Sequence, residues 1–286
     1  MAFHPKKQMH AKFFKPKKNL GQNFLKNYKV VENIMANADI SEKDMIIEVG
    51  PGMGILTEEL AKSGASVLAI EKDFNLIDKL RKDLGKYKNL KITHQDILLF
   101  DPESIDGSYK VIANIPYNIT SPIIRKFLES SHKPQEMILM VQKEVAERIC
   151  AKAGSSERGL LTLIVEFYAD AEVLFSVPRT DFYPVPKVDS AVIKLTLNHK
   201  VHLRGGSYKV EPELFFKLVK AGFASKRQQI HNSLAATLRW DKEKVAGLLE
   251  KSEIDPQLRA EDLTLDAWLN LYQNFIVLYN KEDESN

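Results

Sequence analysis

The stretch MIIEVGPGMG at residues 45–54 decides the fold of this chain of 286 residues. Its first half has the length and the apolar, β-branched composition of a buried strand. Its second half places Gly50, Gly52 and Gly54 before ILTEELAKSG, a helical pattern at residues 55–64. A strand that turns through closely spaced glycines into a helix lets a ligand approach the backbone, as in nucleotide-binding α/β folds. The stretch therefore predicts the first strand and helix of such a fold.

Outward from this unit, strand and helix patterns alternate along the chain. Strand segments are predicted at residues 45–49, 66–73, 90–96, 109–116, 136–142, 161–177 and 190–197, and helices at 28–38, 55–64, 74–87, 121–131 and 144–153. This alternation favours a mostly parallel sheet covered by helices on both faces, which is a Rossmann-like α/β fold.

The polar segment NHKVHLRGGSYKVEP at residues 198–212 marks a domain boundary, because it interrupts the apolar patterns and contains two adjacent glycines. The sequence beyond it shows helical periodicity and no convincing strand. We therefore expect three parts: a basic N-terminal arm at residues 1–27, the α/β domain at 28–198, and a small all-helical domain at 199–286.

The net charge of +3 is unevenly distributed, since eight lysines precede the first acidic residue, Glu32. A segment with this imbalance attracts polyanions and gains free energy by releasing counterions from phosphates. Phe3, Phe13 and Phe14 interleave with the lysines and are suited to stacking on bases. The arm predicts a nucleic-acid partner, and the alternative is a solvated, disordered tail.

Other features of the composition predict absences. No apolar run approaches the roughly 18 residues of a membrane-spanning helix, and no secretory signal is visible. The histidines and the single cysteine, Cys150, show no metal-ligand spacing. We expect a cytoplasmic monomer with no membrane span and no metal site.

Acidic residues at three strand ends predict the cofactor. Glu48 ends the first strand beside the G-x-G-x-G loop, Glu71 closes the second, and Asp96 closes the third. An acid in this place repels a pyrophosphate, whereas S-adenosylmethionine has a sulfonium and an amino group and no phosphate. We interpret Glu71 as the acceptor for the ribose hydroxyls and Asp96 as the acceptor for the adenine amine. The alternative for both is a solvated charge at a strand end.

The methyl-acceptor site is predicted where the fourth strand ends, at Asn114, Ile115, Pro116 and Tyr117. Ligands of open α/β sheets bind beyond the carboxyl ends of the strands, so this tetrapeptide lies beside the cofactor. The Asn114 oxygen and the carbonyl of Ile115 or Pro116 are placed to accept the two N–H bonds of a planar exocyclic amine. Tyr117 offers a face for an extruded base. A turn that only ends a strand is the alternative.

These motifs, EVGPGMG, IEKD, QDIL and NIPYNITSP in this order, resemble those of the rRNA adenine dimethyltransferases. KKNLGQNFL from Lys17, DFYPVPKVDSAVIKL from Asp181 and GFASKRQQIHNSL from Gly222 extend the resemblance over nearly the whole chain. It implies a class I methyltransferase fold with a helical RNA-recognition domain. The branch it resembles most converts two adjacent adenosines near the 3′ end of small-subunit rRNA to N6,N6-dimethyladenosine and acts in assembly of the small ribosomal subunit.

The resemblance also assigns residues. It implies cofactor contacts for Asn23, Leu25, Gly50, Glu71, Asp96 and Asn114, to which the glycine loop adds Gly52 and Gly54, and it implies that Phe182 is a second aromatic wall for the target base. The basic residues expected to bind RNA are Lys17, Lys18, Lys217, Lys220, Lys226 and Arg227, the last four because they lie close enough in sequence for several to share a helix face.

Three alternatives remain open at this stage. An Erm-type enzyme has the same chemistry but methylates one adenine of large-subunit rRNA. A nicotinamide-dependent oxidoreductase is disfavoured by the glycine spacing and by NIPY, which supplies no acid or base for hydride transfer. A non-catalytic RNA-binding assembly factor also fits the basic arm and the helical domain.

Overall fold

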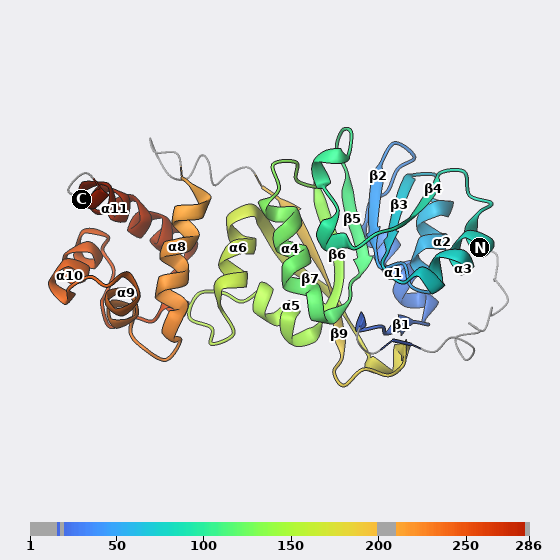
Figure 1. Ribbon diagram of the computed structural model, residues 1–286. Coiled ribbons are helices and arrows are strands. Elements are labelled where there is room, and N and C mark those ends of the chain that lie inside the picture. The colour runs from blue at the N-terminus through green and yellow to red at the C-terminus, as the bar shows by residue number, and fades with distance from the viewer. Residues whose placement is uncertain (1–15, 18–19, 199–209, 284–286) are drawn as a thin grey trace. The chain divides into compact units, whose positions relative to one another are not determined.

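A computed structural model describes residues 16, 17, 20–198 and 210–283. Within them, seven strands form one sheet in the order β4-β3-β2-β5-β6-β9-β7, and two short strands, β1 and β8, form another (Figure 1). The strands are β1 (Phe24–Leu25), β2 (Met45–Val49), β3 (Ser66–Glu71), β4 (Leu90–His94), β5 (Lys110–Asn114), β6 (Glu136–Gln142), β7 (Ala169–Val177), β8 (Phe182–Tyr183) and β9 (Ser190–Leu197).

The helices follow the predicted pattern in most places. They are α1 (Tyr28–Asn37), α2 (Ile55–Lys62), α3 (Phe74–Leu84), α4 (Thr120–Glu129), α5 (Lys143–Ile149), α6 (Leu160–Tyr168), α8 (Pro212–Gly222), α9 (Ile230–Leu238), α10 (Lys242–Lys251) and α11 (Leu265–Asp283). Short 3-10 helices are η3 (Ile97–Leu99), η4 (Pro102–Ser104), η5 (Tyr117–Ile119), η6 (Arg179–Asp181), η7 (Phe223–Ser225) and η8 (Ala260–Asp262). No helix in the described ranges is long and apolar enough to cross a membrane.

The chain divides into two compact units. The sheet unit contains the residues up to Ala146 together with Glu172–Thr196, and the helical unit contains Glu147–Ala171 and the residues from Leu197 onward. This division differs from a single boundary near residue 198, because α6 packs with the C-terminal helices. Phe167 of α6 is buried in their apolar cluster, and its ring stacks on Phe215 at 5.0 Å between centroids.

The sheet unit confirms the predicted mostly parallel sheet. Strands β4, β3, β2, β5 and β6 are parallel to one another, and β9 pairs with β6 in the antiparallel direction. Ile46, Ile112 and Ile138 of three neighbouring strands pack in one cluster with residues of α1 and α2. The alternate positions, such as Ile47 and Val111, are also fully buried, so both faces of the sheet are covered.

The order of the strands predicts where a ligand binds. The chain proceeds from β2 outward through β3 to β4, then returns to the other side of β2 with β5 and continues to β6. Helices and loops therefore diverge between the carboxyl ends of β2 and β5, which is where open α/β sheets bind ligands.

The predicted strand at residues 161–177 is wrong in its first half. Leu160–Tyr168 is the helix α6, and the strand β7 begins only at Ala169. Periodicity does not separate a fully buried helix from a buried strand, and Leu163, Ile164 and Val165 are all almost completely buried.

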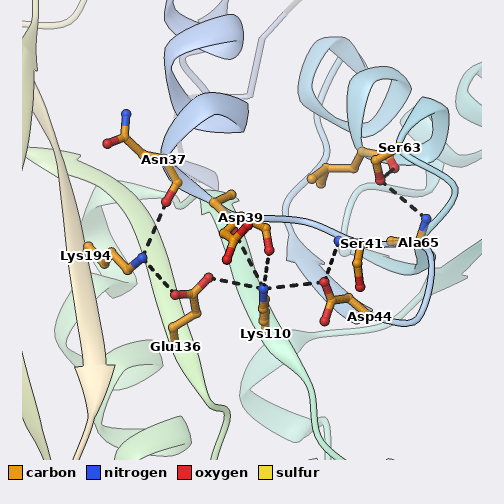
Figure 2. A network of polar contacts seen from close by, with 11 residues as sticks. Asn37, Asp39, Ser41, Asp44, Ser63, Ala65, Lys110, Glu136 and Lys194 are labelled. Atoms are coloured by element: carbon orange, nitrogen blue, oxygen red, sulfur yellow. Dashed lines mark hydrogen bonds and ion pairs between the residues drawn. The ribbon is translucent and has the colours of Figure 1, made fainter.

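A polar network fixes the amino-terminal ends of the central parallel strands, away from the carboxyl ends where the ligand site is expected (Figure 2). Lys110 Nζ donates to the Asp39 carbonyl at 2.7 Å and lies 3.6 Å from Glu136 Oε1. Lys194 Nζ lies 2.9 Å from Glu136 Oε2 and donates to the Asn37 carbonyl at 3.4 Å. The two lysines thereby tie the C-terminal end of α1 to β5, β6 and β9.

Candidate functional site

A pocket lies at the carboxyl ends of β2, β3 and β5 in the sheet unit. Nine of the predicted site residues line it: Asn23, Leu25, Gly50, Gly52, Glu71, Asp96, Asn114, Pro116 and Tyr117. Its wall is completed by Leu20, Gly21, Gln22, Phe24, Glu48, Met53, Lys72, Ile97 and Asn118, among others. The pocket thus collects segments that are up to about a hundred residues apart in sequence.

The glycine loop has the conformation that its sequence predicts. Gly50, Gly52 and Gly54 have φ values of 66°, 56° and 85°, in the left-handed region that favours glycine. A Cβ on Gly52 would lie 3.0 Å from the Phe24 ring, and one on Gly54 would lie 3.0 Å from Leu80 and Leu84. Gly54 therefore supports the packing of α2 and α3 and is not among the residues that line the pocket.

Glu71, at the end of β3, is held by two backbone groups. Its Oε2 accepts from Gly52 N–H at 3.2 Å, and its Oε1 accepts from Asp73 N–H at 2.8 Å. Burial raises the pKa of Glu71, while the two backbone N–H groups oppose the rise. The carboxylate is fixed toward the glycine loop, and each oxygen keeps a further lone pair for a hydroxyl.

Glu48, at the end of β2, is the most deeply buried acid of the pocket. Only 1% of the residue is exposed, and its Oε2 has no hydrogen-bond partner among the described residues. Burial raises its pKa to about 8, and the nearby Glu71 carboxylate contributes to the rise. A buried acid that lines a pocket and keeps one oxygen without a partner favours a cationic ligand, because only a donor or a positive charge offsets the burial of that oxygen.

Asp96 follows β4 and caps η3 by accepting from Leu98 N–H at 3.0 Å. Its other oxygen is ion-paired with Lys72 at 2.7 Å, and the hydrogen bond from Lys72 lowers the pKa of Asp96. The carboxylate is therefore ionised at neutral pH and able to accept a hydrogen bond. Lys72 is the only basic side chain that lines the pocket in the described residues, so the lining is acidic on balance.

The residues before β1 form one wall of this pocket. Asn23 and Leu25, for which cofactor contacts are predicted, line it, and Phe24 pairs with Tyr183 in the short antiparallel ladder of β1 and β8. Lys17 is ion-paired with Asp73 at 2.7 Å, so its charge is engaged within the sheet unit. Lys18 lies outside the described residues.

The acceptor motif begins with Asn114, the last residue of β5. Asn114 Nδ2 points toward the Asn23 carbonyl at 3.4 Å, and no described residue donates to Asn114 Oδ1. Pro116 precedes η5, and Tyr117 donates to or accepts from Ser190 Oγ at 2.6 Å. An open amide oxygen and an anchored aromatic ring therefore both belong to the lining of the pocket.

Phe182 is placed differently from the predicted aromatic wall. It is fully buried in the apolar core with Val31, Ile34 and Val192, and it does not line the pocket. Its β8 neighbour Tyr183 is 39% exposed. Side chains alternate along a strand, so a ladder that buries Phe182 turns Tyr183 outward.

In the helical unit, the four predicted RNA-binding residues are exposed. Lys217 and Lys220 are three residues apart on α8, so they share a face. Lys217 Nζ donates to the Tyr279 hydroxyl at 2.8 Å, and Lys226 donates to the Ser156 carbonyl. Lys226 and Arg227 belong to an exposed run at residues 224–229 that also contains two glutamines.

Two functional candidates were not found from the sequence. Asp73, two residues after Glu71, is 1% exposed and accepts from Lys17 and Gln22, and Ser190 is fully buried behind Tyr117. Asp73 shows only as the start of a helix in the sequence, because an N-cap aspartate is common. Ser190 opens β9, and nothing local in the sequence indicates its contact 73 residues away.

Comparison with known proteins gives a consistent result. The family described as ribosomal RNA adenine dimethylase matches residues 13–276. A curated protein of Dehalococcoides mccartyi, named ribosomal RNA small subunit methyltransferase A, is 44% identical over 269 residues, which are 93% of this chain and 90% of that protein. A Fusobacterium nucleatum protein of the same name is 42% identical, covering 92% and 98%.

Solved structures agree with the fold. The crystal structure of a dimethyladenosine transferase from Plasmodium falciparum matches with a TM-score of 0.76 and 26% identity, over 91% of this chain and 98% of that one. The 23S rRNA methyltransferase ErmE matches with a TM-score of 0.68 and 26% identity, over 88% and 99%. Both likenesses extend well beyond the sheet unit alone.

Proposed function

The chain belongs to the ribosomal RNA adenine dimethylase family, and from this premise we propose that it dimethylates N6 of two adjacent adenosines near the 3′ end of small-subunit (16S) rRNA. The methyl donor is S-adenosylmethionine, and the product is N6,N6-dimethyladenosine. The observation that carries the proposal is the single pocket lining shared by the acidic glycine-loop site and the Asn114–Tyr117 motif, because the two halves serve one methyl transfer.

The residues of the pocket fit this cofactor. The buried Glu48, whose Oε2 has no partner among the described residues, suits a cationic group, while Glu71 suits the ribose hydroxyls and Asp96 the adenine amine. When bound, S-adenosylmethionine supplies an electrophilic methyl group. The glycine loop lets the backbone come close to the ligand, and Asn23 and Leu25 complete the wall on the N-terminal side.

The acceptor half of the site positions an adenine amine. The open Asn114 oxygen accepts one N–H of the amine, and a backbone carbonyl at Ile115 or Pro116 accepts the other. This arrangement aims the lone pair of a weakly nucleophilic amine at the methyl group, so alignment and preorganised dipoles provide the rate gain. Tyr117 stacks on the extruded base, which is worth about 1 to 3 kcal/mol per base. The proton released by the amine passes to water, and no strong general base is required.

The helical unit supports RNA binding in this proposal. Lys217, Lys220, Lys226 and Arg227 are exposed, and we propose that they contact phosphates together with the N-terminal lysines other than Lys17, whose charge is engaged by Asp73. Replacing Lys226 and Arg227 with glutamine is expected to weaken binding of small-subunit particles and to flatten its salt dependence, since each phosphate contact adds to the slope. An unchanged slope would remove these two residues from the RNA interface.

The small-subunit substrate is favoured over the Erm-type alternative by the curated relatives, which carry the small-subunit name at 44% and 42% identity. The alternative has one specific support, the likeness to ErmE with a TM-score of 0.68. The purified protein is assayed with labelled S-adenosylmethionine on small subunits that lack the modification and on protein-free large-subunit rRNA. Labelling of the small subunits alone is expected, and labelling of the large-subunit rRNA alone would replace the proposal with the alternative.

We further propose that the protein acts in the cytoplasm, as a monomer, on an immature small subunit. Sedimentation of the protein with and without assembly intermediates tests the monomeric state and the binding of the immature subunit.

A further inference from the structure

The short segment at residues 20–25 forms a continuous wall of the cofactor pocket. Phe24 packs against Gly52, where a Cβ would come within 3.0 Å of its ring. Gly21 lies so close to Asn118 that a Cβ there would be 2.8 Å from the Asn118 side chain. The wall therefore touches both the glycine loop and the acceptor motif, and its position affects the shape of the whole pocket.

Three attachments hold this wall in place. At its C-terminal end, β1 pairs with β8, and in its middle Asn114 reaches the Asn23 carbonyl with a long contact of 3.4 Å. At its N-terminal end, both oxygens of Asp73 are engaged: Oδ1 accepts from Lys17 Nζ at 2.7 Å and Oδ2 accepts from Gln22 Nε2 at 2.8 Å. The Gln22 amide is also fixed, because its Oε1 accepts from Lys17 N–H at 2.8 Å.

Asp73 has the properties of a rigid anchor. Its side chain has no exposed surface, and the hydrogen bonds from Lys17 and Gln22 contribute most to lowering its pKa, against the effect of burial. It caps α3 by accepting from Asn75 N–H at 3.1 Å, and its own N–H holds Glu71. A buried, charged acceptor makes stronger hydrogen bonds than a neutral one, so this attachment resists displacement.

We propose that Asp73 is a positioning residue for the methyl donor, which fastens residues 20–25 as a wall of the pocket through Lys17 and Gln22. The inference rests on the proposed function, since it concerns binding of the same cofactor. Asp73 does not line the pocket and acts through the wall. Because the wall is held in place before the cofactor binds, binding costs less entropy for ordering the wall.

The test compares the two sides of the attachment in the full-length protein. Asp73→Asn removes the charge and one acceptor but keeps the α3 cap, because asparagine caps helices as well as aspartate does. The combined Lys17→Met and Gln22→Leu variant removes the same bonds from the other side and leaves Glu71 untouched. Asp101→Asn is the matched control, since Asp101 is an exposed N-cap that accepts from Glu103 N–H and does not line the pocket.

Binding of S-adenosylmethionine is measured by calorimetry, and steady-state methylation gives KM and kcat. Both test variants are expected to bind the cofactor roughly tenfold more weakly, as for loss of a charge-assisted hydrogen bond. The KM for the cofactor rises in parallel, and kcat at saturating cofactor changes by less than about twofold. Asp73→Asn combined with Gln22→Leu is expected to bind the cofactor no more weakly than Asp73→Asn alone, because both substitutions break the same attachment. Loss of these buried hydrogen bonds lowers the melting temperature of both test variants relative to Asp101→Asn, so circular dichroism checks that each variant is folded at the temperature of the binding assay.

Wild-type affinity in the Lys17 and Gln22 variant would overturn the inference, as would a loss confined to Asp73→Asn, which would indicate an effect through Glu71. If the losses of binding free energy for Asp73→Asn and Gln22→Leu add up in the double variant, the inference is also contradicted. If the wild-type protein itself fails to bind S-adenosylmethionine, the proposed function fails instead, so the two failures are distinguishable.

Discussion

The Tyr117 hydroxyl lies 2.6 Å from Ser190 Oγ, which joins the acceptor motif to the first residue of β9. Ser190 is fully buried, whereas the Tyr117 residue lines the pocket. Burial raises the pKa of Tyr117, and the hydrogen bond with Ser190 opposes the rise. The hydroxyl thus anchors the ring at its far end and leaves the face of the ring for a base.

Ser190→Ala is expected to slow methyl transfer about tenfold, because the buried tyrosine hydroxyl loses its partner and the ring loses its anchor. Tyr117→Phe removes the same hydrogen bond while keeping the ring, so the double variant should be no slower than either single variant. Single-turnover rates with saturating RNA measure the cycle. Additive effects would show that Ser190 does not act through Tyr117.

Asn114→Ala is expected to lower methylation by roughly 100-fold while RNA binding persists, since the amide oxygen acts only on the reacting amine. Asn37→Ala is the matched control, because the Asn37 amide is exposed and bonds within α1. Transfer of labelled methyl groups and filter binding are measured on the same preparations. A variant as active as the control would show that Asn114 does not position the amine.

Glu48 predicts a pH dependence of stability in the free protein. Its pKa is raised from an ordinary 4.5 to about 8, so the folded state favours the protonated acid. The stabilisation is complete below about pH 4.5 and is lost as the pH rises toward 8. The wild-type melting temperature should therefore fall relative to that of Glu48→Gln across this window. If the melting temperatures of the two proteins change with pH in the same way, the assignment of the raised pKa to Glu48 is contradicted.

The same residue predicts that cofactor binding releases protons near pH 7. A cationic ligand beside Glu48 favours the carboxylate, so the buried acid gives up its proton on binding. Calorimetry in two buffers of different ionisation enthalpy measures the release. Glu48→Gln should bind without it, and equal proton release by both proteins would assign the effect to another group.

Lys110→Met tests the polar network at the amino-terminal ends of the central strands (Figure 2). The side chain of Lys110 is only 11% exposed, and its removal leaves the half-buried carboxylates of Asp44 and Glu136 without this partner. The free energy of unfolding should fall by about 3 kcal/mol, the lower range for breaking a buried pair. Lys79→Met, which removes an exposed pair with Asp83, should cost less than about 1 kcal/mol in urea unfolding. Equal losses would contradict the role of the network.

The sequence patterns predicted the sheet unit well because its signals are local. The glycines of residues 50–54 need left-handed backbone, and acids at successive strand ends meet at one edge of a parallel sheet. These two rules were sufficient to bring Gly50, Glu71, Asp96 and Asn114 to one pocket.

What the sequence did not predict depends on tertiary packing. Leu160–Tyr168 is apolar apart from Thr162 and Glu166, so its packing with the other helices of the helical unit decides that it is a helix. The burial of Phe182 follows from the register of β1 with β8, and pairing between residues more than 150 positions apart leaves no local signal. The contacts of Asp73 with Lys17 and Gln22 also join distant parts of the sequence and leave no local signal.

The most direct test of the central claim is nucleoside analysis of small ribosomal subunits that lack the modification, after incubation with the protein and S-adenosylmethionine. We predict that N6,N6-dimethyladenosine appears at two adjacent positions near the 3′ end of the small-subunit rRNA. RNA that remains unmethylated, or that carries methyl groups on other nucleosides only, would contradict the account.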